Sequence, residues 1–350
     1  MSIDKISQQP HPPIQPDWID APHHIVNIGN LPLEMGGQIR ECKLSYALHG
    51  DISDQTKPLV IFLCAIGSIH HRLDFLINQS RVLDLTNVRI LAIDALGNGF
   101  SSSPSNSSEQ PFFEFPKFTI KDMVNSQKRL LDQLGIKEVH MIVGASMGGM
   151  QALQWAVSYP NFMRHIVALT PMSKTTAWAS SMTRAARESL VPHIKTNGSY
   201  DPETTWRAWL PIMQMLAMRT PNQCDQQFPS PTSMATWYEQ RLAWWKSMNF
   251  HPLDWIYQSI AYDLHDISIT HSFNGNLEQA LASIKAKCLI AVPELDLFNP
   301  IEQAIKTADL IPNSTLIVLK TNWGHMAASA LDPQSTKIIS KAIDELVTSS

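Results

Sequence analysis

The sequence predicts an α/β protein with a mainly parallel, doubly wound sheet and an inserted helical cap. Short apolar runs alternate with longer segments of helical periodicity, as in sheets whose parallel strands are joined by crossover helices. Residues 139–156 contain one such unit without interruption, because an apolar run enters a glycine turn and good helix formers leave it. Residues 172–263 lack a strand signal and hold seven of the chain's ten tryptophans, which indicates a helical insertion.

The composition is that of a globular protein that acts on a small molecule. With 350 residues, 44% of them hydrophobic, the chain is long enough to bury one large core with an inserted subdomain. The net charge is −4 and the basic residues are scattered, so neither nucleic acid nor an anionic membrane is an expected partner. No apolar stretch approaches about 18 residues and the N-terminus has no apolar signal core, so we expect a cytoplasmic protein.

The four cysteines indicate a reducing compartment and no metal site. Cys42, Cys64, Cys224 and Cys288 show no C-x-x-C spacing. Three of them lie in or beside apolar runs, which is typical of buried thiols. We therefore expect no bound metal.

The strand and helix signals divide the chain into a leader, a core and a cap. Residues 1–20 are polar and contain four prolines, which predicts a poorly ordered leader. Residues 21–171 and 264–350 form the predicted core, and residues 172–263 form the predicted cap. Within the core we expect a hairpin at residues 23–27 and 40–48. Six further strands are expected at 59–64, 88–93, 139–143, 165–170, 288–296 and 314–319, the fifth of them ending in acidic residues. A crossover helix is expected at 119–134, before the glycine turn.

Ser146 is the predicted nucleophile. Residues 144–148 satisfy the pattern G-x-S-x-G, in which a strained turn between a strand and a helix lifts the serine hydroxyl above the edge of the sheet. Small residues flank the serine because neighbouring backbone comes too close for side chains. The helix that follows points its N-terminus at the serine, and this partial positive charge favours an anion there.

An acid and a histidine follow later strands at positions suited to activate this serine. Asp296 comes at the end of a late apolar strand, and His325 lies in a glycine-flanked loop after the last strand. We expect His325 to take the proton from Ser146 and return it to the leaving group, and Asp296 to orient the imidazole. Glu294 and Asp266 are the rival acids.

The loop after the strand at residues 59–64 is the predicted oxyanion site. One N–H group is expected from Met147, the residue after the nucleophile. The second is expected from Ala65 or Ile66, and the sequence does not decide between them.

Two pairs of basic residues have roles that the sequence leaves open. His70 and His71 follow the oxyanion loop; a metal or acid–base role is conceivable, but a solvated helix start is the preferred interpretation. Arg184 and Arg187 lie on the first cap helix, where an arginine in an apolar lid can receive a carboxylate bidentately. The alternative for each is a surface arginine paired with Glu188 or with solvent.

Four motifs together are similar to those of one known family. They are the long stretch at residues 144–156, the pair at 265–266, residues 294–298 and the pair at 324–325. From Tyr46 to the C-terminus, the chain resembles the homoserine O-acetyltransferase family of α/β-hydrolase-fold enzymes.

This resemblance implies a fold, a mechanism and a set of site residues. It implies the α/β-hydrolase fold and a triad of Ser146, Asp296 and His325 that is acylated on the serine in a ping-pong scheme. It also implies that Arg187 holds the carboxylate of the substrate, that acetyl-CoA is the co-substrate if the enzyme is a transferase, and that the protein is a homodimer.

Two departures from the family pattern influence the expected function. The family usually has His-Ala-Leu-Thr-Gly in the oxyanion loop, whereas residues 64–67 read Cys-Ala-Ile-Gly and are one residue shorter. The family also usually has an aspartate directly after the catalytic histidine, thought to meet the substrate amine, and Met326 stands there. A homoserine ammonium would lack its partner, and an unpaired buried charge is costly.

We therefore expect a serine enzyme that forms an acyl-Ser146 intermediate and hydrolyses a small carboxylic ester or a related acyl compound. The alternative is an acyl-CoA-dependent O-acetyltransferase acting on homoserine or a related alcohol. A catalytically silent member retained for binding is a third interpretation, which the intact set of serine, aspartate and histidine disfavours. None of these functions requires a bound cofactor.

Overall fold

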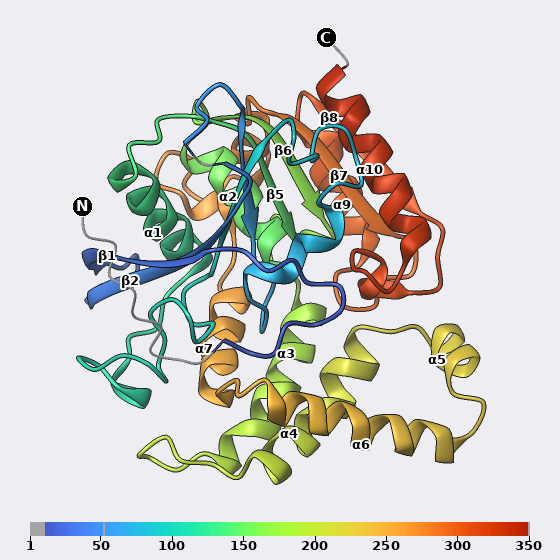
Figure 1. Ribbon diagram of the computed structural model, residues 1–350. Helices are drawn as coiled ribbons and strands as arrows, with labels where there is room; N and C mark the ends of the chain where they lie inside the picture. The colour runs from blue at the N-terminus through green and yellow to red at the C-terminus, as the bar shows by residue number, and fades with distance from the viewer. Residues whose placement is uncertain (1–10, 52, 349–350) are drawn as a thin grey trace.

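A computed structural model describes residues 11–51 and 53–348, and an eight-stranded sheet lies at its centre (Figure 1). The strand order is β1-β2-β4-β3-β5-β6-β7-β8. The β1–β2 and β2–β4 pairs are antiparallel and the remaining neighbours are parallel, so the predicted mainly parallel sheet is confirmed. The strands are β1 His23–Pro32, β2 Gln38–His49, β3 Leu59–Leu63, β4 Arg89–Ile93, β5 Val139–Ala145, β6 Met163–Leu169, β7 Lys287–Pro293 and β8 Ser314–Leu319.

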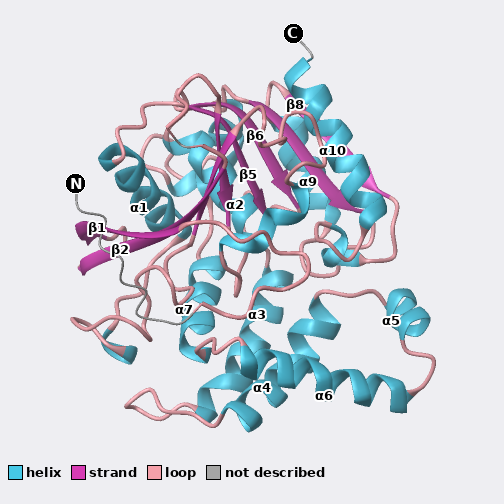
Figure 2. Cartoon of the chain, in the orientation of Figure 1, coloured by secondary structure: helices cyan, strands magenta, loops and turns pink. Residues whose placement is uncertain are grey.

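Helices cover both faces of this sheet (Figure 2). The α-helices are α1 Ile120–Gln133, α2 Met147–Ser158, α3 Ala177–Leu190, α4 Pro202–Leu210, α5 Pro221–Gln227, α6 Pro231–Ser247, α7 Pro252–Asp263, α8 Leu277–Ala282, α9 Ile301–Leu310 and α10 Pro333–Thr348. The shorter helical segments are η1 His70–Leu76, η2 Phe112–Glu114, η3 Val191–His193, η4 Pro211–Ala217, η5 Ile267–Ile269 and η6 Gly324–Ala327. The predicted crossover helix is α1, which Thr119 caps by accepting a hydrogen bond from the Asp122 N–H.

Successive residues of the central strands face two different apolar layers. Leu59, Ile61 and Leu63 of β3 belong to the apolar cluster that contains α1 and α2. Val60 and Phe62 belong to the cluster that contains η1 and α10. This alternation follows from the two-residue period of a strand, and burial of both faces explains why the strand reads as a continuous apolar run.

Five α-helices, α3 to α7, lie within residues 172–263, the segment where the helical insertion is predicted. Figure 1 shows α4, α5 and α6 gathered below the sheet, with α3 and α7 leading toward it. Tryptophans form the centre of this layer. Trp206 stacks on Trp245 with ring centroids 5.2 Å apart, and Trp209 meets the edge of Trp255 at 5.4 Å.

The N-terminal segment differs from the predicted poorly ordered leader. Residues 1–10 lie outside the described part of the chain. Residues 11–20 form no helix or strand, but the indole of Trp18 stacks on His71 at 4.4 Å and the Ile19 N–H donates to Asp74 at 2.8 Å. The prediction is therefore corrected for residues 11–20: prolines prevent regular pairing there, yet they leave side chains free to contact the core.

The cysteines agree with the sequence-based expectation of buried thiols. Cys42, Cys64 and Cys288 are buried, Cys224 is half-buried, and all four are free. Burial raises the pKa of the Cys288 thiol to about 12, so it stays protonated at neutral pH. None of the helices within residues 11–51 and 53–348 combines the length and apolar character needed to span a bilayer.

Candidate active site

Ser146 occupies a strained turn between β5 and α2. Its backbone has φ 56° and ψ −121°, in a region that side-chain-bearing residues rarely adopt. The turn is so tight that a Cβ on Gly144 would lie 2.0 Å from the Gly148 carbonyl oxygen, and a Cβ on Gly148 would lie 2.4 Å from the Leu63 carbonyl oxygen. The two glycines of the G-x-S-x-G pattern are therefore needed for close backbone approach.

The structure brings the three predicted triad residues into one hydrogen-bonded chain. His325 Nε2 lies 2.8 Å from Ser146 Oγ, and His325 Nδ1 lies 2.7 Å from Asp296 Oδ2. All three side chains are buried: the exposed fraction is 3% for Ser146, 3% for His325 and 5% for Asp296. This order of contacts places Nε2 where a general base must stand to receive the serine proton. We refer to these three residues as the candidate triad.

Backbone N–H groups hold the carboxylate of Asp296. The N–H groups of Phe298 and Asn299 both donate to Oδ1 at 2.9 Å, which leaves Oδ2 for the histidine. The Asn299 amide in turn donates to the Thr170 carbonyl oxygen at 2.7 Å and accepts from the Tyr262 hydroxyl. Burial, together with the nearby charge of Asp296, raises the pKa of Tyr262 well above its ordinary value, so this hydroxyl remains a donor.

The two other candidate acids, Asp266 and Glu294, have partners other than His325. Asp266 pairs with Lys174 Nζ at 2.8 Å and accepts from the Ser268 N–H at 2.9 Å. Glu294 is exposed, and the hydrogen bond assigned to it joins its backbone N–H to the Leu319 carbonyl oxygen at 3.1 Å. Among the three candidates, Asp296 is the one that contacts His325.

The predicted oxyanion loop is fixed from the cap by a residue that sequence analysis missed. Gln258 of α7 accepts from the Gly67 N–H at 2.9 Å and donates to the Leu96 carbonyl oxygen at 3.1 Å. It is fully buried, although 191 positions separate it from Gly67. The available signal was a lone amide within the apolar helix α7, since a buried polar side chain needs partners.

The other end of this loop is tied to the elbow helix. Gln151 of α2 donates to the Cys64 carbonyl oxygen at 3.0 Å. The N–H groups of Gly67 and Ser68 have acceptors of their own, so Ala65 and Ile66 stay the candidate donors that the sequence proposes. The other expected donor, Met147, is the first residue of α2 and directly follows the serine.

Aromatic rings lie against the oxyanion loop and against His325. A Cβ on Gly67 would lie 3.0 Å from Cδ1 of Trp255 and 3.9 Å from Trp245, so cap tryptophans cover the oxyanion loop. Phe298 meets the His325 ring edge-on at 5.1 Å. These neighbours are apolar, and such surroundings strengthen electrostatic interactions at the loop and at His325.

Arg187 differs from the expected free carboxylate receptor. Its Nη2 lies 2.6 Å from Asp263 Oδ2, and its Nη1 donates to Ser259 Oγ at 3.2 Å. Both charged side chains are only 16% exposed. The guanidinium of Arg187 is therefore already neutralised within the cap, whereas Arg184 is exposed near Glu188, as the alternative interpretation expected.

The interpretation of His70 and His71 as a solvated helix start is wrong. They do begin the short helix η1, but they are 3% and 4% exposed. Two buried carboxylates provide hydrogen-bond partners for the buried ring nitrogens: His70 Nδ1 lies 3.0 Å from Asp94 Oδ2, and His71 Nδ1 lies 2.6 Å from Asp74 Oδ2.

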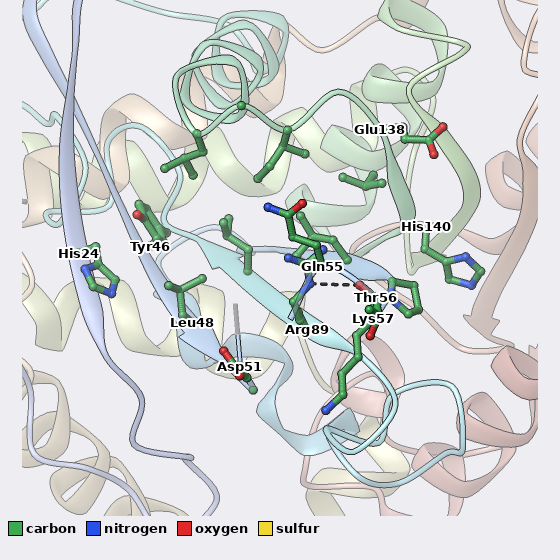
Figure 3. Close-up of a pocket in the computed structure, with 18 of the residues that line it drawn as sticks. His24, Tyr46, Leu48, Asp51, Gln55, Thr56, Lys57, Arg89, Glu138 and His140 are labelled. Carbon is green, nitrogen blue, oxygen red and sulfur yellow. Dashed lines mark hydrogen bonds between the residues drawn. The ribbon is translucent and has the colours of Figure 1, made fainter. Parts of the chain in front are cut away.

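A separate cavity of about 920 Å³ lies at the opposite end of the parallel strands (Figure 3). Its lining includes Leu59, Arg89 and Val139, which begin β3, β4 and β5. In the close-up, Arg89 donates to the Lys57 carbonyl oxygen at 3.1 Å. Ser146 follows the last residue of β5, so this cavity and the candidate triad lie at opposite ends of the parallel strands.

Comparisons with known proteins agree with this fold and site. The family model for the alpha/beta hydrolase fold matches residues 58–328. A homoserine O-acetyltransferase from Chloroherpeton thalassium is 27% identical over 319 residues, 84% of this chain and 82% of the relative. An ethyl acetate hydrolase from Pseudomonas veronii is 27% identical over 351 residues, 94% of this chain and 96% of the relative.

The solved structure of an acetylester hydrolase from Corynebacterium glutamicum has the same fold. It superposes with a TM-score of 0.83, covers 93% of this chain and 95% of its own, and is 24% identical in sequence. The resemblance to homoserine O-acetyltransferases and the predicted fold class are both confirmed.

Proposed function

Because this chain belongs to the alpha/beta hydrolase fold family, we propose that it hydrolyses a small carboxylic ester through an acyl-Ser146 intermediate. The observation that carries the proposal is the hydrogen-bonded chain from Ser146 Oγ through His325 to Asp296. Similarity to an ethyl acetate hydrolase over nearly the whole chain supports it.

In the first half of the proposed reaction, His325 Nε2 takes the proton of Ser146 as Oγ forms a bond to the ester carbonyl carbon. The carbonyl oxygen becomes an anion, which accepts hydrogen bonds from the N–H of Met147 and from that of Ala65 or Ile66. Each such donor contributes roughly 10²–10³ in rate. The tetrahedral intermediate collapses, the carbon–oxygen bond to the alcohol breaks, and His325 returns its proton to the departing alkoxide.

In the second half, water repeats these steps on the acyl enzyme. His325 takes a proton from water, the hydroxide oxygen bonds to the acyl carbon, and the bond to Ser146 Oγ breaks with return of the proton. Asp296 stabilises the imidazolium in both halves by its contact with Nδ1. The reaction needs no bound cofactor and no metal.

A second candidate function is acetyl transfer from acetyl-CoA to homoserine or a related alcohol. Similarity to a homoserine O-acetyltransferase over 84% of the chain favours it. Two features of the chain oppose it: Asp263 occupies the guanidinium of Arg187, and Met326 offers no charge to a substrate ammonium. We therefore place hydrolysis first.

The test is a pair of assays on the full-length protein. One follows hydrolysis of p-nitrophenyl acetate and butyrate, and the other follows release of free CoA from acetyl-CoA with and without homoserine. Ser146→Ala is expected to lower ester turnover by roughly 10⁴–10⁶-fold. Ser181→Ala is the matched control, because Ser181 is exposed and its hydroxyl donates to the Ala177 carbonyl oxygen of its own helix.

The two assays distinguish the candidates. Ester turnover that depends on Ser146, without homoserine-dependent release of CoA, supports hydrolysis. Homoserine-dependent release of CoA would favour transfer instead. Absence of both activities, with no labelling of Ser146 by a fluorophosphonate, would support a catalytically silent protein.

A further inference from the structure

Three histidine side chains converge away from the candidate triad. His11 Nε2 lies 3.3 Å from His70 Nε2 and 3.2 Å from His71 Nε2, and one ring nitrogen from each of the three histidines lies within 4.8 Å of the other two. We call these residues the histidine cluster. His70 and His71 are buried in η1, and the half-buried His11 reaches them from the N-terminal segment.

In each of these histidines the other ring nitrogen, Nδ1, faces an oxygen atom that can accept a hydrogen bond but has no hydrogen to donate. His11 Nδ1 lies 2.7 Å from the Pro12 carbonyl oxygen. His70 Nδ1 and His71 Nδ1 lie on the carboxylates of Asp94 and Asp74, as described above. Each Nδ1 must therefore carry the hydrogen, and in a neutral imidazole this leaves a lone pair on each Nε2.

Hydrogen bonds within the described residues do not satisfy these three lone pairs. Within residues 11–51 and 53–348, no N–H or O–H group of another residue donates to the three Nε2 atoms, whose hydrogen-bond contacts are with one another. A second histidine group nearby differs in this respect. Asp94 accepts there from Ser45 and faces His23 and His70, so donors and acceptors match and no cation is needed.

We propose that His11, His70 and His71 bind a divalent metal ion of the zinc class through their Nε2 atoms. Imidazole is a preferred ligand of Zn²⁺, and a histidine ligand almost always donates its other N–H to a carboxylate or a carbonyl group. Tetrahedral Zn–N bonds of 2.0–2.1 Å place ligand nitrogens ~3.3–3.4 Å apart. The two closest separations in the cluster, 3.2 and 3.3 Å, agree with this spacing.

The metal joins two segments that are distant in sequence. His11 and His70 are 59 residues apart, which explains why the spacing of residues in the sequence predicted no metal site. Trp18 on His71 and the Ile19 N–H on Asp74 hold the same N-terminal segment in place. The bound ion therefore fastens residues 11–20 to η1, next to the oxyanion loop, and its fourth position is open to water or another ligand.

The proposal is tested by metal binding to the full-length protein after treatment with a chelator. Isothermal titration with Zn²⁺ and metal analysis after gel filtration should both give one ion per chain. Co²⁺ should bind in its place and give the visible absorption of a tetrahedral site. Bound Zn²⁺ should also raise the Tm, because the ion binds the folded chain.

Two variants and one control locate the ion. His11→Ala should weaken Zn²⁺ binding by more than about 100-fold and abolish the rise in Tm, and Asp74→Asn should weaken binding about 10–100-fold. His11 lies in a segment without helix or strand, so its removal leaves the folded core in place, as circular dichroism can verify. His193→Ala, at an exposed histidine in η3, should bind Zn²⁺ like the unaltered chain.

Two results would overturn the proposal. One is a folded, metal-free protein that binds neither Zn²⁺ nor Co²⁺, which would indicate that a proton on His11 is shared within the cluster. The other is Zn²⁺ binding that His11→Ala leaves unchanged.

Discussion

Two regions of the molecule hold a histidine by its Nδ1 atom on a buried carboxylate. In the candidate triad, Asp296 holds His325 at 2.7 Å and the free Nε2 faces a hydroxyl group, Ser146 Oγ. In the histidine cluster, Asp94 and Asp74 hold two histidines at 3.0 and 2.6 Å, and each free Nε2 faces another ring nitrogen.

In both regions the carboxylate sets the tautomer of the histidine, and the group opposite Nε2 sets its chemistry. Opposite a hydroxyl, an oriented lone pair can accept a proton and return it. Where the lone pair on Nε2 faces other lone pairs, no proton is available to it, and it is suited to bind a metal cation. The same pair of side chains therefore prepares proton transfer at one site and metal binding at the other.

Removing the carboxylate from the candidate triad should have the largest effect. Asp296→Asn should lower kcat for ester hydrolysis by roughly 10⁴-fold, because an amide no longer fixes the Nδ1–H tautomer or stabilises the imidazolium. Asp266→Asn is the matched control, since this acid pairs with Lys174 instead of His325. Steady-state kinetics on p-nitrophenyl acetate measures both variants, and equal losses would show that the acid is wrongly assigned.

Loosening the oxyanion loop should have a smaller effect on the same reaction. Gln258→Leu removes the acceptor of the Gly67 N–H and should lower kcat by about 10²-fold with little change in KM, because a small displacement of a donor weakens transition-state binding. Gln154→Leu is the control, because this buried amide contacts Ser158 and Thr270 away from the loop. A change in KM alone would contradict the positioning role of Gln258.

The cap arginine should affect stability more than catalysis. Arg187→Met removes the ion-pair partner of the mostly buried Asp263, which keeps only the hydrogen bond from the Thr183 hydroxyl, and should lower the free energy of unfolding by about 1–2 kcal/mol. The KM for short neutral esters should stay within about twofold. Urea denaturation tests the stability, and kinetics on a neutral ester and on an ester with a free carboxylate test substrate binding. An unchanged stability with a large rise in KM for the carboxylate-bearing ester alone would restore the role of carboxylate receptor.

Asp254 is a buried carboxylate outside both histidine sites, and its protonation should make the stability of the protein depend on pH. Burial raises the pKa of Asp254 from 3.8 to about 7, although the Ser105 N–H and hydroxyl donate to it. Between these values the folded chain holds a proton that the unfolded chain has released, so the free energy of unfolding falls as the pH rises from about 4 to 7. Asp254→Asn should flatten this decline, as urea denaturation at pH 5 and 7 would show; a parallel decline in both proteins would contradict it.

Features encoded by contiguous residues were predictable from the sequence. The elbow was predicted at residues 139–156; the observed β5 lies within that stretch, and α2 begins in it and ends two residues beyond it, at Ser158. The strand at 314–319 has the predicted bounds, whereas the hairpin strands are longer than predicted, because pairing across the β1–β2 ladder extends them beyond the alternating segment. The candidate triad was also predictable, since the carboxyl ends of parallel strands converge.

Features that depend on contacts between distant segments were not predictable. The burial of His70 and His71 requires the carboxylates of Asp74 and Asp94 and the N-terminal residues that cover them. Neither periodicity nor spacing places residue 11 beside residue 70. The pairing of Arg187 likewise depends on how α3 packs against α7, which the residues of α3 alone do not determine.

The most direct test of the account is to trap the acyl enzyme. The protein is mixed with p-nitrophenyl acetate, quenched with acid during turnover and digested, and its peptides are analysed by mass spectrometry. We predict an acetyl group on Ser146 that is absent from Ser146→Ala and accumulates less in His325→Ala. Ester turnover that persists in Ser146→Ala, or an acetyl group carried by another residue during turnover, would contradict the assignment of Ser146 and His325 as nucleophile and base.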